Sequence, residues 1–335
     1  MINSNVKLNS KIYDEDIEQI PTRHGYGEGL AIAGEKNKNI VALCADLTDS
    51  TMTSIFKEKF PDRFIEMGVA EQNMAAVAAG LEHSGKIPFI SSYAVFSPGR
   101  NNEQIRTLIS YSGRNVKIVG AHAGISVGPD GATHQALEDI ALMRVQPRMT
   151  VIAPCDSIEA KKATMAAAEF NGPVYLRLTR EKTPVITTEE TPFKIGKAFI
   201  FRDPSLDGKN SDVAIIACGP LVHNAILAAD ELSREGVECI VVNNHTIKPM
   251  DTGTIIDAAK RSGAVVTVEE HQINGGLGSV VCEILAENYP APLERIGVRD
   301  RFGESGTPNE LVEKFGMGVK DIKEAVLKVL KRKLR

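Results

Sequence analysis

The chain alternates short, continuous apolar runs with segments of helical character, and this pattern restricts the fold more than any other feature. Apolar runs typical of strands occur at 40–43, 63–67, 87–91, 116–119, 150–153 and 174–178. Segments with a helical pattern separate them, at 71–82, 102–111, 135–143 and 157–169. Continuous apolar strands separated by helices are typical of a parallel sheet covered on both faces. The pattern therefore predicts an α/β protein.

A second set of alternating segments follows a polar break, and it indicates a second domain. The break lies at 183–191, with another polar stretch at 203–212. Beyond it, strand-like and helix-like runs occur at 213–217, 222–235, 240–243, 254–261, 265–268, 278–288 and 319–330. A chain of 335 residues is also long enough for two hydrophobic cores. We therefore expect a polar N-terminal extension over 1–20, a first α/β domain over 21–186, a linker over 187–196 and a smaller α/β domain over 197–335.

Composition and charge exclude several classes of protein. The 39 Lys and Arg residues against 43 Asp and Glu leave a net charge of −4, so the chain offers no broad basic face for nucleic acid. No apolar run approaches the ~20 residues of a membrane helix, and the polar N-terminus lacks the apolar core of a signal peptide. The five cysteines stand singly, without metal-ligand spacing, which indicates reduced thiols in a cytoplasmic protein.

Two glycine-rich segments invite a nucleotide-binding interpretation. The first, HGYGEG at 24–29, has the wrong spacing for a dinucleotide fingerprint. The second, NGGLG at 274–278, follows a predicted strand and begins a helix, where its amide groups are placed to bind an anion. A tight turn that allows close backbone packing is the simpler interpretation of this second segment. Neither segment supports an ATPase or an ordinary dehydrogenase.

Polar residues gather after the predicted strands of the first domain. The three clusters are ADLTDS at 45–50, GVAEQNM at 68–74 and HAGISVGPDGATHQ at 122–135. In an open α/β sheet, ligands bind outside the carboxyl ends of the strands, where we expect these clusters to lie. Glu71 precedes a run of small apolar residues, so its carboxylate would stand at a helix N-terminus. On its own, a Glu at such a position usually only compensates the helix dipole.

Three motifs together change that interpretation. GVAEQNM, the DGATH of 130–134 and the Asp46-Leu47-Thr48 turn occur in the order and spacing of the transketolase family. Over residues 20–335 the chain resembles the C-terminal two-thirds of a thiamine-diphosphate-dependent transketolase. The resemblance implies a pyrimidine-binding domain with a mostly parallel sheet, followed by the smaller α/β transketolase C-terminal domain.

The resemblance also implies which residues hold the cofactor. Glu71 matches the glutamate that contacts N1′ of the aminopyrimidine ring, where a carboxyl group assists proton transfer through that ring. Phe96 matches the aromatic residue that stacks on the pyrimidine, and Tyr93 would form a wall of the same pocket. Asp46 matches an aspartate of the cofactor pocket. A buried carboxyl with a raised pKa would suit the role of Glu71.

Further residues match the part of the family's site that binds the sugar. His134 and Asp130 match residues that contact the donor sugar's hydroxyls near the reacting carbon, where a titrating His is a natural proton shuttle. The cluster that receives the sugar phosphate is matched by Arg23, Ser50, His122 and Arg180. Two guanidinium groups, an imidazole and a hydroxyl would form a phosphate clamp. We therefore expect Glu71, His134 and Asp130 to be the catalytic residues.

A complete transketolase also needs a domain that binds the diphosphate and its Mg²⁺, and the signature of that domain is absent. The sequence contains no Gly-Asp-Gly, and its Asn243-Asn244 pair has no such upstream partner. We assign no metal ligand to this chain and expect Mg²⁺ or Ca²⁺ to be held mainly by a separate N-terminal subunit. The hypothesis is a split transketolase, an α₂β₂ heterotetramer of the cytoplasmic pentose phosphate pathway. It would transfer a two-carbon ketol unit from a ketose phosphate to an aldose, and this chain would be inactive alone.

Three alternatives remain open at this point. A 1-deoxyxylulose-5-phosphate synthase has a similar DGxTH motif but is normally one long chain. The β subunit of a 2-oxoacid dehydrogenase is a separate subunit of about this size but usually lacks DGxTH. The third alternative is a non-catalytic, regulatory transketolase-like subunit. The presence of Glu71, Asp130 and His134 together argues against the third, because a structural role would not require that polar set.

Overall fold

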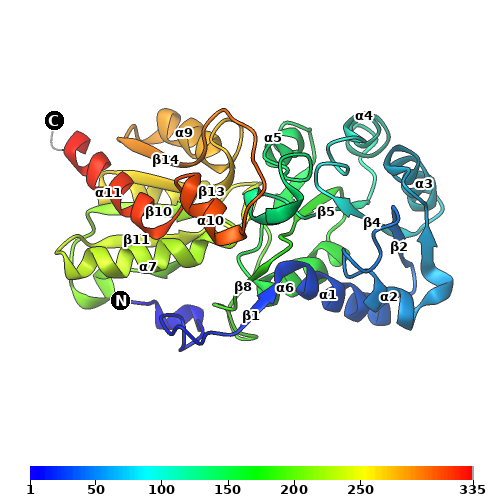
Figure 1. The fold of residues 1–335 in the computed structure, drawn as a ribbon, viewed down its shortest axis with the longest axis horizontal. Helices are drawn as coiled ribbons and strands as arrows, with labels where there is room; N and C mark the ends of the chain where they lie inside the picture. The colour runs from blue at the N-terminus through cyan, green and yellow to red at the C-terminus, as the bar shows by residue number, and fades with distance from the viewer. Residues whose placement is uncertain (334–335) are drawn as a thin grey trace.

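A computed structural model describes residues 1–333, and it contains two α/β domains arranged side by side (Figure 1). The first domain is built on a seven-stranded sheet. Its strands, in spatial order, are β12 (Thr246–Lys248), β6 (Thr150–Ile152), β7 (Val174–Arg177), β5 (Lys117–Ala121), β4 (Ile87–Tyr93), β2 (Ile40–Cys44) and β3 (Phe64–Glu66). Neighbouring strands are parallel except for β12, which runs antiparallel to β6.

Helices cover both faces of this sheet, which is why its central strands are buried and mostly apolar. Every residue of β2, β5 and β7 is buried. The helices of the domain are α1 (Thr22–Lys36), α2 (Ser54–Lys59), α3 (Glu71–His83), α4 (Asn102–Gln104), a π-helical segment (Ile105–Ser110), α5 (Asp139–Arg144) and α6 (Ser157–Glu169). α1, α2 and α6 pack on one face, and α3, the π-helical segment and α5 pack on the other (Figure 1).

The first glycine-rich segment lies inside α1, where it allows this helix to pack closely on α6. A Cβ atom at Gly25 would lie 1.8 Å from the carbonyl oxygen of Ser157, and one at Gly29 would lie 2.7 Å from the carbonyl oxygen of Lys161. Neither distance is possible for a real side chain, so both positions require glycine. The segment therefore serves helix packing, in agreement with its rejection as a dinucleotide-binding loop.

The second domain is built on a five-stranded sheet that is also mostly parallel. Its strands, in spatial order, are β14 (Leu293–Val298), β13 (Val265–Gln272), β10 (Val213–Ala217), β11 (Cys239–Asn243) and β9 (Phe199–Arg202). Only β9 is antiparallel to its neighbour. Its helices are α7 (Leu221–Arg234), α8 (Thr252–Ser262), α9 (Leu277–Asn288), α10 (Pro308–Lys314) and α11 (Val319–Lys333). The fold class expected from the sequence is confirmed; residues 334–335 of the second predicted domain lie outside the described residues.

Three features join the two domains. β12 belongs to the second domain by sequence but pairs with β6 of the first sheet, through Thr246 and Ile152. One hydrophobic core contains residues of both domains, from α3 and α5 of the first and from α8 and α9 of the second. The N-terminal segment also spans them, because Asn3 donates its amide to Phe201 O (2.9 Å), while β1 (Gln19–Pro21) pairs with β8 (Lys182–Pro184). In Figure 1 this dark-blue segment passes below α7 before it reaches the first domain.

Several local predictions differ from the structure. The helix expected at 135–143 begins only at Asp139, because Ala136 is extended and forms a bridge with Ala123. The helix expected at 102–111 is a short α-helical turn followed by the π-helical segment. The predicted linker over 187–196 stays a prediction, and its first residue is anchored, since Thr187 donates its amide and hydroxyl to Asp156 at 2.6 and 2.8 Å. Short 3₁₀ helices occupy Ser4–Val6, Pro61–Arg63, Ile125–Asp130 and Pro204–Asp207.

Candidate functional site

A buried carboxylate stands at the start of α3, where the sequence places the first candidate residue. Glu71 is 1% exposed and is the first residue of the helix. Ser92, in β4, donates its hydroxyl to Glu71 Oε1 at 3.3 Å, and Asn101 donates its side-chain amide to the Glu71 carbonyl oxygen at 3.1 Å. The end of β4 therefore orients this carboxyl group and the following loop holds the backbone of Glu71, beyond any compensation of the helix dipole.

The second oxygen of this carboxylate is bound by Arg100, a residue that the sequence did not single out. Arg100 Nη1 lies 2.9 Å from Glu71 Oε2. The same guanidinium group stacks over the Phe96 ring, with 4.6 Å between its central carbon and the ring centroid. Arg100 thus covers both the carboxylate and the aromatic face that the sequence assigns to the pyrimidine ring.

Four of the predicted residues meet in one aromatic cluster. The rings of Tyr93 and His122 are stacked, with 3.8 Å between their centroids. His134 presents its edge to Tyr93 and to Phe96, at centroid distances of 6.1 and 5.7 Å. These residues come from the end of β4, from the turn that follows it and from the two ends of the segment 122–135, so the fold brings together side chains that are up to 41 positions apart (His134 and Tyr93).

Basic side chains border this cluster. Arg23, at the start of α1, donates to the carbonyl oxygens of Ser50 (2.6 Å) and Arg180 (3.0 Å). Burial, together with the positive charges of Arg23 and Arg180, lowers the pKa of His122 to about 3, so its imidazole is neutral at physiological pH. Its Nδ1 atom is buried and has no hydrogen-bond partner within residues 1–333. The four residues expected to receive a phosphate are therefore neighbours, although Ser50 contacts Arg23 through its carbonyl oxygen.

The segment with the DGATH motif, residues 122–135, forms a loop that contains a 3₁₀ helix, and we call it the DGATH loop. Asp130 is exposed, while His134 is half-buried and its Nδ1 lies 3.0 Å from the hydroxyl of Thr133. Gly128 and Gly131 have φ values of +81° and +75°, so the path of the loop depends on glycine at both positions.

Asp46 lies apart from the residues described above. It follows β2, is exposed, and has no side-chain hydrogen bond or ion pair within the described part of the chain. Its turn is held by Glu66, which accepts the amides of Asp46 (2.8 Å) and Gly68 (3.1 Å) through Oε1 and the hydroxyl of Thr48 (2.9 Å) through Oε2. The structure does not bring Asp46 into contact with Glu71, and its expected role stays a prediction.

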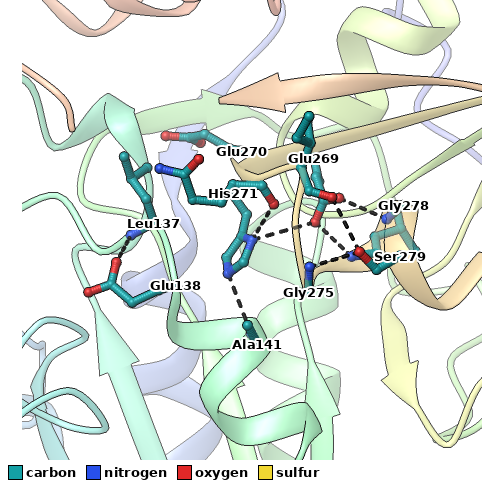
Figure 2. A network of polar contacts seen from close by, with 12 residues as sticks. Leu137, Glu138, Ala141, Glu269, Glu270, His271, Gly275, Gly278 and Ser279 are labelled. Carbon is teal, nitrogen blue, oxygen red and sulfur yellow. Dashed lines mark hydrogen bonds and ion pairs between the residues drawn. The ribbon is translucent and has the colours of Figure 1, made fainter. Parts of the chain in front are cut away.

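The second glycine-rich segment leads into α9, and the anion at this helix N-terminus is a carboxylate of the protein. Glu269, in β13, accepts the amides of Leu277 and Gly278, both at 2.7 Å. A Cβ atom at Gly276 would lie 2.0 Å from Glu269 Oε2, so the close approach requires glycine there. Figure 2 shows Glu269 directed toward this segment. The simpler interpretation of the segment, close packing of the backbone, agrees with these contacts.

Sequence reasoning did not identify Ser92, Arg100 and Asn101 around Glu71. For Arg100, the local signal that could have identified it is its position four residues after Phe96 in the same turn. Within residues 1–333, no group of three or more His, Cys, Asp or Glu side chains is placed to hold a metal ion. No helix in the same range has both the length and the apolar composition needed to cross a bilayer.

Comparison with known proteins agrees with the motifs. Residues 18–185 match the family "Transketolase, pyrimidine binding domain", and residues 205–322 match "Transketolase, C-terminal domain". A putative transketolase C-terminal section of Methanocaldococcus jannaschii is 46% identical, over 92% of this chain and 96% of that protein. A 6-deoxy-6-sulfo-D-fructose transketolase subunit of Clostridium sp. is 41% identical, over 96% of this chain and 98% of that protein.

A solved structure extends the similarity to three dimensions. It is described as a split gene transketolase in an inactive β4 tetramer, and it superposes with a TM-score of 0.86 at 46% identity. The superposition covers 94% of this chain and 99% of that chain. The resemblance drawn from the three sequence motifs is therefore confirmed. The chain belongs to the transketolase family, and its two α/β domains are the family's pyrimidine-binding and C-terminal domains.

Proposed function

We propose that this chain is the pyrimidine-binding subunit of a split transketolase that uses thiamine diphosphate. The enzyme transfers a two-carbon ketol unit from a ketose phosphate to an aldose, and a separate subunit binds the diphosphate. Two relatives of nearly the same length are named as a section or a subunit of a transketolase, which supports the division into two chains. The inactive tetramer of the similar structure supports the expectation that this chain alone does not turn over.

One observation carries this proposal: a buried carboxyl group stands beside an aromatic face. An aminopyrimidine needs a flat apolar surface for its ring and a hydrogen-bonding group at a ring nitrogen, and Phe96 and Glu71 provide these two features within reach of one Arg100 side chain. When bound, thiamine diphosphate supplies a carbon nucleophile that can carry a two-carbon unit. Glu71 would hold a proton at N1′ of the pyrimidine, Tyr93 would border the ring, and Asp46 would contact the cofactor from the neighbouring turn.

The remaining residues of the site would bind the sugar. His134 and Asp130 would contact its hydroxyl groups, and His134 would move a proton to or from an oxygen near the reacting carbon. Arg23 and Arg180 would bind the anionic end of the sugar, with Ser50 beside them. Because His122 is neutral, it would donate or accept one hydrogen bond without adding charge. Its unpartnered, buried Nδ1 atom supports a ligand at this position.

The proposal also covers the metal ion and the assembly of the two subunits. Mg²⁺ or Ca²⁺ would bind the diphosphate through oxygen ligands of the partner subunit, in an α₂β₂ heterotetramer. Neutralisation of the phosphates by the partner's ion would leave this chain to orient the pyrimidine and the sugar. We place the reaction in cytoplasmic carbohydrate metabolism, with pentose phosphates as the first substrates to test.

The experiment combines the chain with a diphosphate-binding partner and measures two-carbon transfer with pentose phosphates and with 6-deoxy-6-sulfo-fructose. Activity should require both chains, thiamine diphosphate and Mg²⁺. Glu71→Gln should lower kcat at least about 100-fold, because general acid–base catalysis typically contributes that much. Glu82→Gln is the matched control, since Glu82 lies on the same helix but pairs with Arg114 outside the site. Unchanged turnover in Glu71→Gln would refute the catalytic assignment, and consumption of pyruvate would favour the 1-deoxyxylulose-5-phosphate synthase or dehydrogenase alternatives.

A further inference from the structure

Two adjacent carboxylates of the C-terminal domain serve different parts of the molecule. Glu269 and Glu270 are consecutive residues of β13, so their side chains lie on opposite sides of the strand, as Figure 2 shows. Glu269 binds the start of α9 within its own domain. Glu270 crosses to the pyrimidine-binding domain, where its Oε1 accepts the backbone amide of Ser126 at 2.5 Å.

The contact of Glu270 with the DGATH loop is buried and tightly fitted. Glu270 is 3% exposed. Gly124, two residues before Ser126, has a φ of +89°, and a Cβ atom there would lie 2.3 Å from Glu270 Oε1. The loop can therefore approach the carboxylate only because position 124 is glycine. Burial raises the pKa of Glu270 above its ordinary value, and the hydrogen bond from Ser126 opposes this shift.

A buried ion pair fixes the base of this contact. Arg177, in β7, donates to the backbone carbonyl of Glu270 at 2.7 Å. The same guanidinium group is paired with Asp139 at 2.8 Å, and Tyr175 donates its hydroxyl to Asp139 at 2.7 Å. Arg177 and Asp139 are both almost fully buried. Through Arg177, β13, which carries Glu270, is therefore hydrogen-bonded to β7 of the first sheet.

The other end of the loop is also held by the C-terminal domain. Gln135 Nε2 donates to the carbonyl oxygen of Ile125 (3.0 Å), inside the loop, and to that of Glu304 (2.9 Å) in the C-terminal domain. A Cβ atom at Gly303 would lie 1.8 Å from Gln135 Oε1, and one at Gly131 would lie 2.6 Å from the hydroxyl oxygen of Ser305. The segment 303–306 therefore lies directly against the loop that contains Asp130 and His134.

From these contacts we propose that the C-terminal domain positions the DGATH loop, with Glu270 and Gln135 as the positioning residues. Glu270 holds the loop near His122, and Gln135 holds it next to His134. Neither residue touches the substrate; each acts through the loop backbone. The consequence for sugar binding rests on the proposed function, whereas the contact between the domains does not.

The test compares Glu270→Ala with two matched variants. Glu270→Gln keeps an oxygen that can accept the Ser126 amide, and Glu269→Ala removes the neighbouring carboxylate, whose hydrogen bonds within residues 1–333 go to Leu277 and Gly278 of the C-terminal domain. Hydrogen exchange of residues 124–134 should be at least about tenfold faster in Glu270→Ala, unchanged in Glu269→Ala and nearly normal in Glu270→Gln. Gln135→Met should loosen the same loop independently, which provides a second variant if Glu270→Ala does not fold.

The kinetic measurement uses the complex with the partner subunit. Glu270→Ala should raise KM for the ketose phosphate about tenfold, while the dissociation constant of thiamine diphosphate changes less than about twofold. Glu270→Gln should restore KM. Unchanged loop exchange in both Glu270→Ala and Gln135→Met would overturn the proposal, as would equal effects of Glu269→Ala and Glu270→Ala on KM. If the wild-type complex transfers no ketol unit, the proposed function fails, and the exchange measurement still decides whether the C-terminal domain holds the loop.

Discussion

Replacement of Arg100 by glutamine should increase the affinity for thiamine diphosphate. In the structure, Arg100 is bonded to Glu71 and stacked on Phe96, the two groups that would receive the aminopyrimidine ring. A pyrimidine in that position must displace the guanidinium group. The wild-type protein therefore loses the free energy of these two contacts each time the cofactor binds, and the variant does not.

The gain in affinity expected for Arg100→Gln follows from how strongly Arg100 is held by Glu71 and Phe96. Glu71 is buried, but the side chain of Arg100 is 46% exposed, so water screens the pair from the arginine side and its worth is about 0–1 kcal/mol. Stacking of an exposed guanidinium on an aromatic ring adds about 0.5–1 kcal/mol. Together they amount to about 0.5–2 kcal/mol, and since 1.4 kcal/mol is about tenfold in affinity, we expect a dissociation constant about 2- to 30-fold lower in Arg100→Gln.

The assay is calorimetric titration of thiamine diphosphate into the complex with the partner subunit, at fixed Mg²⁺ and ionic strength. Arg106→Gln is the matched control, because it removes the same charge from an exposed position of the same segment. This control separates a local effect from a general change in attraction for the diphosphate. Equal or weaker binding by Arg100→Gln would refute the reasoning and would show that Arg100 helps to hold the cofactor.

Two further predictions concern stability. Burial raises the pKa of Glu159 from 4.5 to about 7. Between these pH values the folded protein keeps a proton that the unfolded chain has lost. The free energy of unfolding should therefore fall by about 3 kcal/mol as the pH rises from about 4.5 to about 7. Urea unfolding at pH 5, 6 and 7 should show this loss in the wild type and little of it in Glu159→Gln; parallel curves would contradict it. Gly25→Ala should destabilise the protein by about 1–3 kcal/mol, since the methyl group meets Ser157, whereas Gly80→Ala in α3, where nothing lies within 4 Å of the new atom, should stabilise it by up to about 1 kcal/mol. Thermal unfolding of the two variants would contradict this if both shift in the same direction.

The local sequence pattern was sufficient to predict most of the central strands and the helices that begin beside a polar residue. β2 and β10 are apolar at every position because helices cover both faces of each sheet, and that requirement is visible in the sequence itself. α3 begins at Glu71, as its run of small apolar residues indicates. By contrast, α1 was not predicted, since its glycines suggest a loop until the close approach of α6 explains them.

The candidate site divides in the same way. The motifs around Glu71, Asp130 and His134 were recognisable because each is a short, local pattern that follows one strand or loop. The pairing of Arg100 with Glu71, and the contact of Glu270 with Ser126, which is 144 positions away in the chain, depend on how distant segments pack. The charge and hydrogen-bonding capacity of each side chain follow directly from the sequence. Which of these groups pair with one another is decided only when folding buries them together and removes water. The sequence by itself therefore determined the fold class and the residues available for chemistry, and the tertiary structure decided which of them meet.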